Sequence, residues 1–128
     1  MSYSLDRAFP GATFDEIETR TRAALVAQNF GVMTEIGVSE KLKAKLDVDM
    51  PRYLILGACK PALAQQLIEA EPKVGVMLPC NVVLREVEGG VEVSAVDPVA
   101  SMMAIGNPAL EGILTQVRGM LEEMIAAI

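Results

Sequence analysis

The chain has 128 residues, 52% of them hydrophobic, and a formal net charge of −6 from 11 basic and 17 acidic residues. This length predicts one domain over residues 1–128. Its core is expected to be aliphatic, because the sequence has only two Tyr and three Phe and lacks Trp. The acidic balance and the few aromatic side chains argue against nucleic-acid binding. Without histidine, the chain has no imidazole base, no Ser-His-Asp or Cys-His pair and no His-containing zinc site.

The N-terminal segment carries charged and turn-forming residues early, and no apolar run approaches the ~18 residues that suggest a membrane helix. We therefore expect a soluble, cytoplasmic protein that does not engage a membrane. Two cysteines in such a chain are not a disulfide framework.

The first half of the chain alternates strand and helix patterns. Residues 3–9 alternate apolar and polar side chains, which predicts a strand that ends at Pro10-Gly11. Thr13 and Glu16 then form a capping box at the start of a helix, and residues 30–36 alternate again as a second strand. Ser39 is expected to cap a short helix, whose three lysines are interpreted as a solvated face or, alternatively, as an anion contact; they are Lys41, Lys43 and Lys45.

The second half contains the most apolar segments. In order, the predicted elements are a strand over 53–58, a helix over 62–70 with Pro61 in its first turn, strands over 74–78, 82–87 and 91–96, and a long C-terminal helix opened by Asn107-Pro108. Gly89-Gly90 is the expected hairpin turn. This order predicts an α+β fold: a single curved mixed, mainly antiparallel sheet with helices packed on it. One face of that sheet is expected to be covered by a second copy, which makes the protein a homodimer.

The candidate site lies in the segment 52–81, which holds both cysteines. Cys59 follows a buried strand and precedes a helix, so the helix dipole and Lys60 are expected to lower the pKa of its thiol. Cys80 follows the predicted strand 74–78. If this strand and strand 53–58 are parallel neighbours, both sulfurs emerge at the same sheet edge. The alternative is that both cysteines simply pack as small apolar side chains.

Three functional hypotheses follow from this segment. The first is a small-molecule or anion-binding module with Cys59, Lys60, Cys80, Asn81 and Arg52 as candidate ligand-binding residues. The second is a thiol redox or sulfur-transfer protein in which Cys59 attacks and Cys80 resolves, so whether the chain is an enzyme stays open. The third is a Cu(I) binder.

Other side chains can contribute to these sites. Met77 or Met50 can assist a Cu(I) site, whereas the remaining methionines, Met102-Met103 included, are interpreted as flexible core filler. Asn81 can orient a ligand or bond the backbone after Pro79. Arg52 and Asp97 flank strand ends and can form a pair or a pocket rim, while nothing in the spacing brings Glu35 to Asp97. The sequence holds no dinucleotide-binding or phosphate-loop motif and no run of metal ligands, so we predict no cofactor.

The segments GACKPALA, LPCNVV and VSAVDP, together with FGVMTEIGVSEKLKAKLDVD, resemble the family of domains of unknown function numbered 302. The resemblance covers nearly the whole chain. It implies a small α+β domain with a curved sheet similar to the TATA-binding-protein-like class, usually dimeric, and it brings no established activity. Lys60 stands where the family commonly has Asn, so a role that depends on that Asn is in doubt.

Overall fold

Five strands form one antiparallel sheet in the computed structural model, which describes residues 2–128. The strands are β1 (Ser4–Pro10), β2 (Gly31–Gly37), β3 (Tyr53–Cys59), β4 (Cys80–Val87) and β5 (Gly90–Val96), in the spatial order β1-β5-β4-β3-β2. Every neighbouring pair runs antiparallel, so the α+β class is confirmed and the expectation of a mixed sheet is corrected. The segment between β3 and β4 contains a helix and a 3-10 turn and joins antiparallel neighbours.

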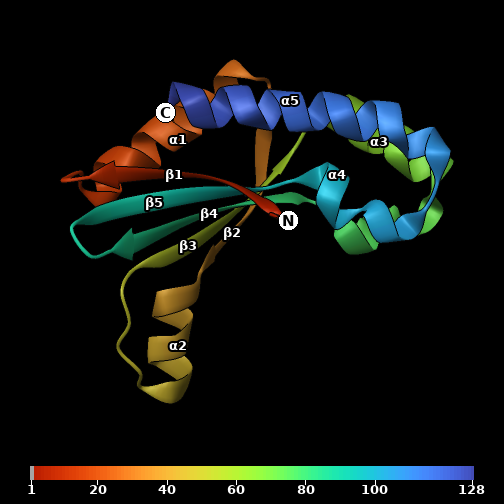
Figure 1. Cartoon of the computed structure of the whole chain (residues 1–128). Coiled ribbons are helices and arrows are strands. Elements are labelled where there is room, and N and C mark those ends of the chain that lie inside the picture. Colours follow the sequence, from red (N-terminus) through yellow and green to blue (C-terminus); the bar gives the residue numbers. More distant parts are fainter. Residues whose placement is uncertain (1) are drawn as a thin grey trace.

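Two long helices cover one face of the sheet. They are α1 (Phe14–Ala27) and the C-terminal α5 (Glu111–Ala127), and Figure 1 shows both on the same side. Thr13 caps the start of α1 as predicted, because the Glu16 N–H donates to Thr13 Oγ1 over 3.2 Å, while the Glu16 carboxylate pairs with Arg20 at 3.5 Å. The core between these layers is aliphatic, as predicted, and its fully buried side chains include Ile17, Leu25, Leu56, Val82, Leu84, Val93, Leu121 and Met124.

The remaining helices lie at the margins of the sheet. Figure 1 shows α2 (Val38–Leu46) on the side opposite α1 and α5, and α3 (Pro61–Ala70) and α4 (Pro98–Ser101) beyond one end of the strands. Short 3-10 turns span Pro72–Met77, Met103–Ile105 and Pro108–Leu110. A second apolar cluster joins these pieces to the start of α5; it consists of Leu67, Val74, Met102, Leu110 and Leu114.

Three local predictions are wrong. The apolar run 74–78 is a 3-10 helix with Val74 as its buried residue, since a short apolar run does not by itself distinguish strand from helix. Ser39 does not cap α2, which begins after Gly37; its hydroxyl instead accepts a hydrogen bond from the Tyr53 N–H over 3.1 Å. The hairpin turn lies one residue earlier than expected, because Val87 pairs with Gly90 and leaves Glu88-Gly89 as the turn.

None of the helices within residues 2–128 has both the length and the apolar character that a bilayer crossing requires.

Candidate functional site

Both cysteines line one small cavity at the end of the sheet where α3 begins. The cavity has room for about 20 Å³ and is walled mainly by apolar side chains from β3, α3, α4 and α5. Cys59 and Lys60 lie at the end of β3, Cys80 opens β4, and Met102 follows α4. A space of this size holds one water molecule or one metal ion.

The strand register places the two cysteines on neighbouring strands. Ala58 pairs with Cys80 across the β3–β4 ladder, so Cys59 and Cys80 stand on adjacent strands one position out of register. The parallel pairing expected for the two strands is wrong: the neighbours are antiparallel, and Cys80 begins a strand rather than ending one. Cys80 shares a face of the sheet with its partner Ala58, so alternation assigns Cys59 to the opposite face at the strand end, and the closeness of the two sulfurs stays a prediction. Within residues 2–128 neither cysteine is in a disulfide.

The predicted lowering of the Cys59 pKa is wrong. Burial raises the pKa of the Cys59 thiol, because a thiolate loses its hydration inside the protein. Burial, with the nearby Cys59 as a second cause, raises the pKa of Cys80 to about 11. Cys59 precedes α3 by two positions, since Lys60 is the N-cap and Pro61 is the first helical residue, so the helix start does not outweigh burial. Both thiols are therefore protonated at neutral pH in the unliganded protein.

Lys60 stands at the cavity wall with its ammonium group already engaged. Its Nζ donates to the Gln28 carbonyl over 2.5 Å and lies 5.2 Å from the centre of the Phe30 ring, and Phe30 lines the same cavity. Lys60 thus lines the cavity while its ammonium group is bound to the Gln28 carbonyl.

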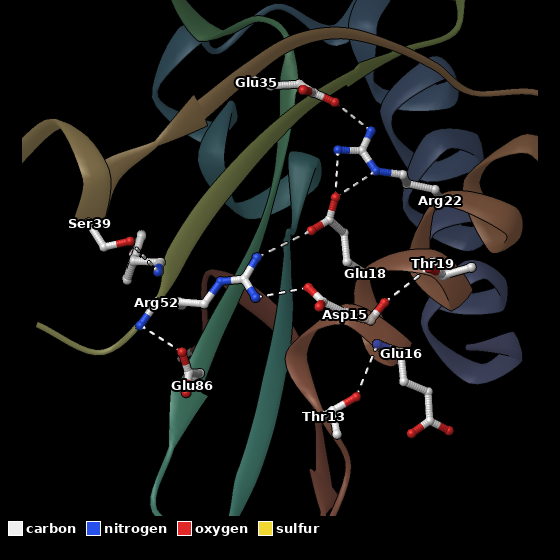
Figure 2. Close-up of polar contacts among 11 residues, drawn as sticks. Thr13, Asp15, Glu16, Glu18, Thr19, Arg22, Glu35, Ser39, Arg52 and Glu86 are labelled. Carbon is white, nitrogen blue, oxygen red and sulfur yellow. Dashed lines mark hydrogen bonds and ion pairs between the residues drawn. The ribbon is translucent and has the colours of Figure 1, made fainter.

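Arg52 lies away from this cavity, at the opposite end of β3. Its guanidinium group packs 4.0 Å above the Phe14 ring and donates to Asp15 over 2.9 Å. Figure 2 shows that Arg52 and Arg22 both point toward Glu18, with Arg22 also bridging to Glu35 over 2.5 Å. This network fastens α1 to β2 and β3, and Arg52 forms no pair with Asp97. The charges of this network pair with one another, so its role is structural.

Asn81 lies on the other face of the sheet from Cys80. Successive side chains of a strand alternate between faces, so Cys80 is buried while Asn81 is exposed. Asn81, Tyr53, Val83 and Arg85 line an open hollow of about 540 Å³ on the face that α1 and α5 leave uncovered. Asn81 and Arg52 are therefore both separate from the thiol cavity.

Asp97 anchors the segment that carries Met102. Its Oδ1 accepts hydrogen bonds from Val99 N over 3.0 Å and Ala100 N over 3.2 Å, and its Oδ2 accepts from Arg118 Nε over 2.9 Å. Burial acts to raise the pKa of this carboxyl, but the bonds from Arg118 and the two N–H groups outweigh it and the net pKa is lowered. Asp97 therefore caps α4 and ties it to α5.

Met102 is the contributor that sequence reasoning missed. Its side chain is almost completely buried and lines the thiol cavity, whereas the two methionines proposed for a Cu(I) site, Met77 and Met50, do not. The prediction that Met102 is core filler is confirmed, since it belongs to the second apolar cluster, whereas Met103 is 59% exposed. Residues 2–128 contain no group of three or more His, Cys, Asp or Glu side chains placed to hold a metal ion.

The model of the family described as "Domain of unknown function DUF302" matches residues 6–128. The chain belongs to this family. A similar solved structure is the crystal structure of an uncharacterized conserved DUF302 protein from Bacillus stearothermophilus, with a TM-score of 0.91 and 23% sequence identity over 99% of this chain and 98% of that chain. At this identity the likeness establishes the shared fold. No curated protein matches the chain.

Proposed function

We propose that this DUF302 protein binds a single soft metal ion, Cu(I), in the cavity lined by Cys59, Cys80 and Met102. The observation that carries the proposal is that both cysteines and the buried Met102 line one space of about 20 Å³. Sulfur ligands select Cu(I) over hard cations such as Mg²⁺ or Ca²⁺. An organic ligand does not fit this space without displacing the walls.

The charges of the cavity favour the same ion. Binding replaces the two thiol protons: Cu(I) forms bonds to both sulfurs, and two protons leave to solvent, so the dithiolate complex carries one negative charge. Among residues 2–128, Lys60 is the one charged residue in the cavity lining, and its charge is positive.

The other two hypotheses have weaker support in this geometry. For anion binding, the Lys60 ammonium is held by the Gln28 carbonyl and Pro61 removes one N–H at the start of α3. For thiol catalysis, the raised pKa values keep both sulfurs protonated near neutral pH and therefore poorly nucleophilic. A reducing cytoplasm, the location expected from the sequence, keeps both thiols available to the metal.

The test is an anaerobic titration of the folded protein with Cu(I) against a competing chelator. We expect one ion per chain, at least a 100-fold loss of affinity in Cys59→Ser and in Cys80→Ser, and about a tenfold loss in Met102→Leu. Met77→Leu is the matched control, because Met77 is 39% exposed and does not line the cavity. Circular dichroism checks that each variant folds. A wild-type affinity equal to that of the Cys59→Ser/Cys80→Ser double variant would overturn the proposal.

We also propose that the chain acts as a homodimer joined through β2 and α2. The nine-residue helix α2 has no buried residue, and an isolated helix of this length is marginal in water. Exposed apolar side chains continue from β2 through α2 to the following loop; they are Val32, Met33, Ile36, Leu46 and Val48. A second copy that packs on this surface buries them and supports α2, and the twofold symmetry of a dimer uses the same surface twice.

A further inference from the structure

The molecule carries an open hollow and a projecting helix on the same side of the sheet. The hollow has a volume of about 540 Å³ and lies on the face that α1 and α5 leave uncovered. Most of its lining comes from β1, β5 and β4, and none of the described residues in it belongs to β2 or α2. Figure 1 shows α2 extending from the sheet on this same side, where it follows β2 at the sheet edge. The two features therefore belong to opposite halves of one open face.

The strand register sets the chemistry of the hollow. Asp6 pairs with Ser94, and Ser94 pairs with Val83, so these three side chains form one row across β1, β5 and β4. Arg85 and Glu92 also line the hollow and neutralise one another over 2.9 Å. The carboxylate of Asp6, in contrast, accepts from a serine hydroxyl and pairs with no cation within residues 2–128. The hollow thus combines an apolar position at its floor with one uncompensated negative charge.

The helix α2 offers the complementary chemistry. Val38, Leu42 and Leu46 recur every four residues and form one apolar stripe, of which Leu46 is 66% exposed. Lys41 and Lys45 lie along one side of this stripe, and neither forms an ion pair in the described part of the chain. The helix carries three lysines against one glutamate, in a chain whose formal net charge is −6. A basic helix with an apolar stripe therefore matches a hollow that is acidic and apolar.

A twofold axis brings the helix of one copy to the hollow of another. The strand order β1-β5-β4-β3-β2 keeps α2, which follows β2, away from the hollow of its own chain. When two open faces lie opposite one another about a twofold axis along the strands, the β2 edge of each copy faces the β1 edge of the other. The α2 helix of each copy then stands over the partner's hollow, and the same contact forms twice.

We infer that each chain of the dimer inserts its α2 into the open-face hollow of the other, with the apolar stripe on Val83 and the lysines at Asp6. This inference rests on the proposed homodimer and names the surface of the second copy that receives α2. It accounts for two unpartnered features at once: the partner supplies the burial that the nine-residue α2 lacks, and α2 fills the hollow.

The first experiment measures the dimer dissociation constant by sedimentation equilibrium. Ser94→Lys places bulk and a positive charge on the floor of the hollow, so we expect dimerisation to weaken at least tenfold. Thr19→Lys is the matched control, because Thr19 is exposed on α1, on the opposite side of the sheet. Asp6→Lys should also weaken the dimer, and adding Lys41→Glu and Lys45→Glu to the same chain should restore the constant to within about threefold of wild type.

The second experiment locates the contact by cross-linking between two chains. Both chains carry Cys59→Ser and Cys80→Ser; one also carries Leu46→Cys and the other Ser94→Cys. A short bismaleimide should join the two chains, because α2 of the first reaches the hollow of the second. Thr19→Cys in place of Ser94→Cys should give no cross-linked pair. Circular dichroism checks that each variant folds.

The outcomes separate this inference from the dimer on which it rests. If wild type sediments as a single chain at every concentration, the proposed homodimer itself fails. If wild type dimerises and Leu46→Asp disrupts the dimer, but Ser94→Lys behaves like Thr19→Lys and no cross-link forms, the dimer stands and the insertion of α2 into the hollow is overturned.

Discussion

The most informative single residue is Cys80, because its burial determines how the site responds to pH. Burial raises the pKa of its thiol from 9.0 to about 11 in the folded protein. At neutral pH the thiol is therefore protonated, and a bound ion has to displace that proton together with the one on Cys59. Metal affinity and fold stability consequently depend on pH in opposite directions.

For metal affinity, we expect the apparent Cu(I) binding constant to rise about 100-fold for each pH unit between pH 6 and 8, since two protons are released for each ion bound. Chelator-competition titrations at several pH values measure this slope. A binding constant that does not change with pH would mean that Cu(I) does not replace the thiol protons.

For stability, the same pKa shift predicts a loss in alkali. Above pH 9 the thiol ionises in the unfolded chain but stays protonated in the folded one, so the free energy of unfolding falls until the pH passes about 11. The full contribution of Cys80 is roughly 2 to 3 kcal/mol, present below pH 9. Urea denaturation of wild type and Cys80→Ala at pH 8 and pH 10.5 isolates it: the wild type should lose more stability than the variant. Equal losses would refute the raised pKa.

Gly57 shows how a residue without a side chain positions the site. A Cβ atom at Gly57 would overlap the Thr34 hydroxyl and lie 2.7 Å from Pro79 Cγ, immediately before Cys80. We expect Gly57→Ala to lower the free energy of unfolding by about 1–3 kcal/mol through overpacking. Gly31→Ala is the control, because its nearest contact there is the Cys59 carbonyl oxygen at 3.8 Å. Chemical denaturation compares the two variants, and equal stabilities would contradict this packing argument.

At the scale of elements, the short helix α4 positions part of the second apolar cluster, since Val99 packs against it and Met102 belongs to it. It has four residues, so its own hydrogen bonds cannot hold it. The Asp97 carboxylate stabilises it in two ways: it caps the helix N-terminus by accepting from the Val99 N–H, and it binds Arg118 on α5. Met102 follows directly after α4 and is buried against Leu67 and Leu114. The position of the Met102 thioether therefore depends on Asp97, the N-cap at the other end of α4.

We expect Asp97→Ala to lower the free energy of unfolding by about 1–2 kcal/mol, the usual cost of a lost N-cap, and to weaken Cu(I) binding. Asp97→Asn should be milder, because its amide oxygen still accepts from Val99 and Ala100 while the ion pair with Arg118 is lost. Asp49→Ala is the control, since Asp49 is 90% exposed and pairs with Lys43 on the surface. If Asp97→Ala matches the control in stability and Cu(I) affinity, the capping role is refuted.

At the scale of the whole molecule, the sheet has one covered and one open face. The helices α1 and α5 bury the covered face, and the open face and α2 remain to be protected (Figure 1). The proposed dimer uses β2 and α2 for this purpose, at the opposite edge of the sheet from β1.

We expect wild type to elute with twice the 13.7 kDa mass of one chain in size-exclusion chromatography with light scattering. Leu46→Asp, which places a charge on the apolar side of α2, should give the single-chain mass. Val76→Asp is the control: Val76 is 85% exposed in the 3-10 helix before β4, away from β2 and α2. A single-chain mass for wild type, or an unchanged mass for Leu46→Asp, would refute this interface.

The sequence by itself determined the class of fold and most of the element boundaries. Local sequence is sufficient for these features, because Thr13 and Pro61 mark helix starts and alternating apolar and polar side chains mark strands. Such signals hold where tertiary packing favours the same structure. The resemblance to the DUF302 family was also readable from the segments around Cys59 and Cys80. The run 74–78 was misread because its apolar residues suit a buried strand and a 3-10 turn equally.

The tertiary structure decided the composition and the chemistry of the candidate site. Strand pairing placed Cys59 and Cys80 at one cavity through antiparallel neighbours, and packing of α4 on α5 brought in Met102 from a distant part of the chain. The same packing set the direction of the thiol pKa shifts, because desolvation depends on the atoms that surround a sulfur in space. Neighbours in sequence suggested a lowered pKa at Cys59, and burial by residues far along the chain reversed it.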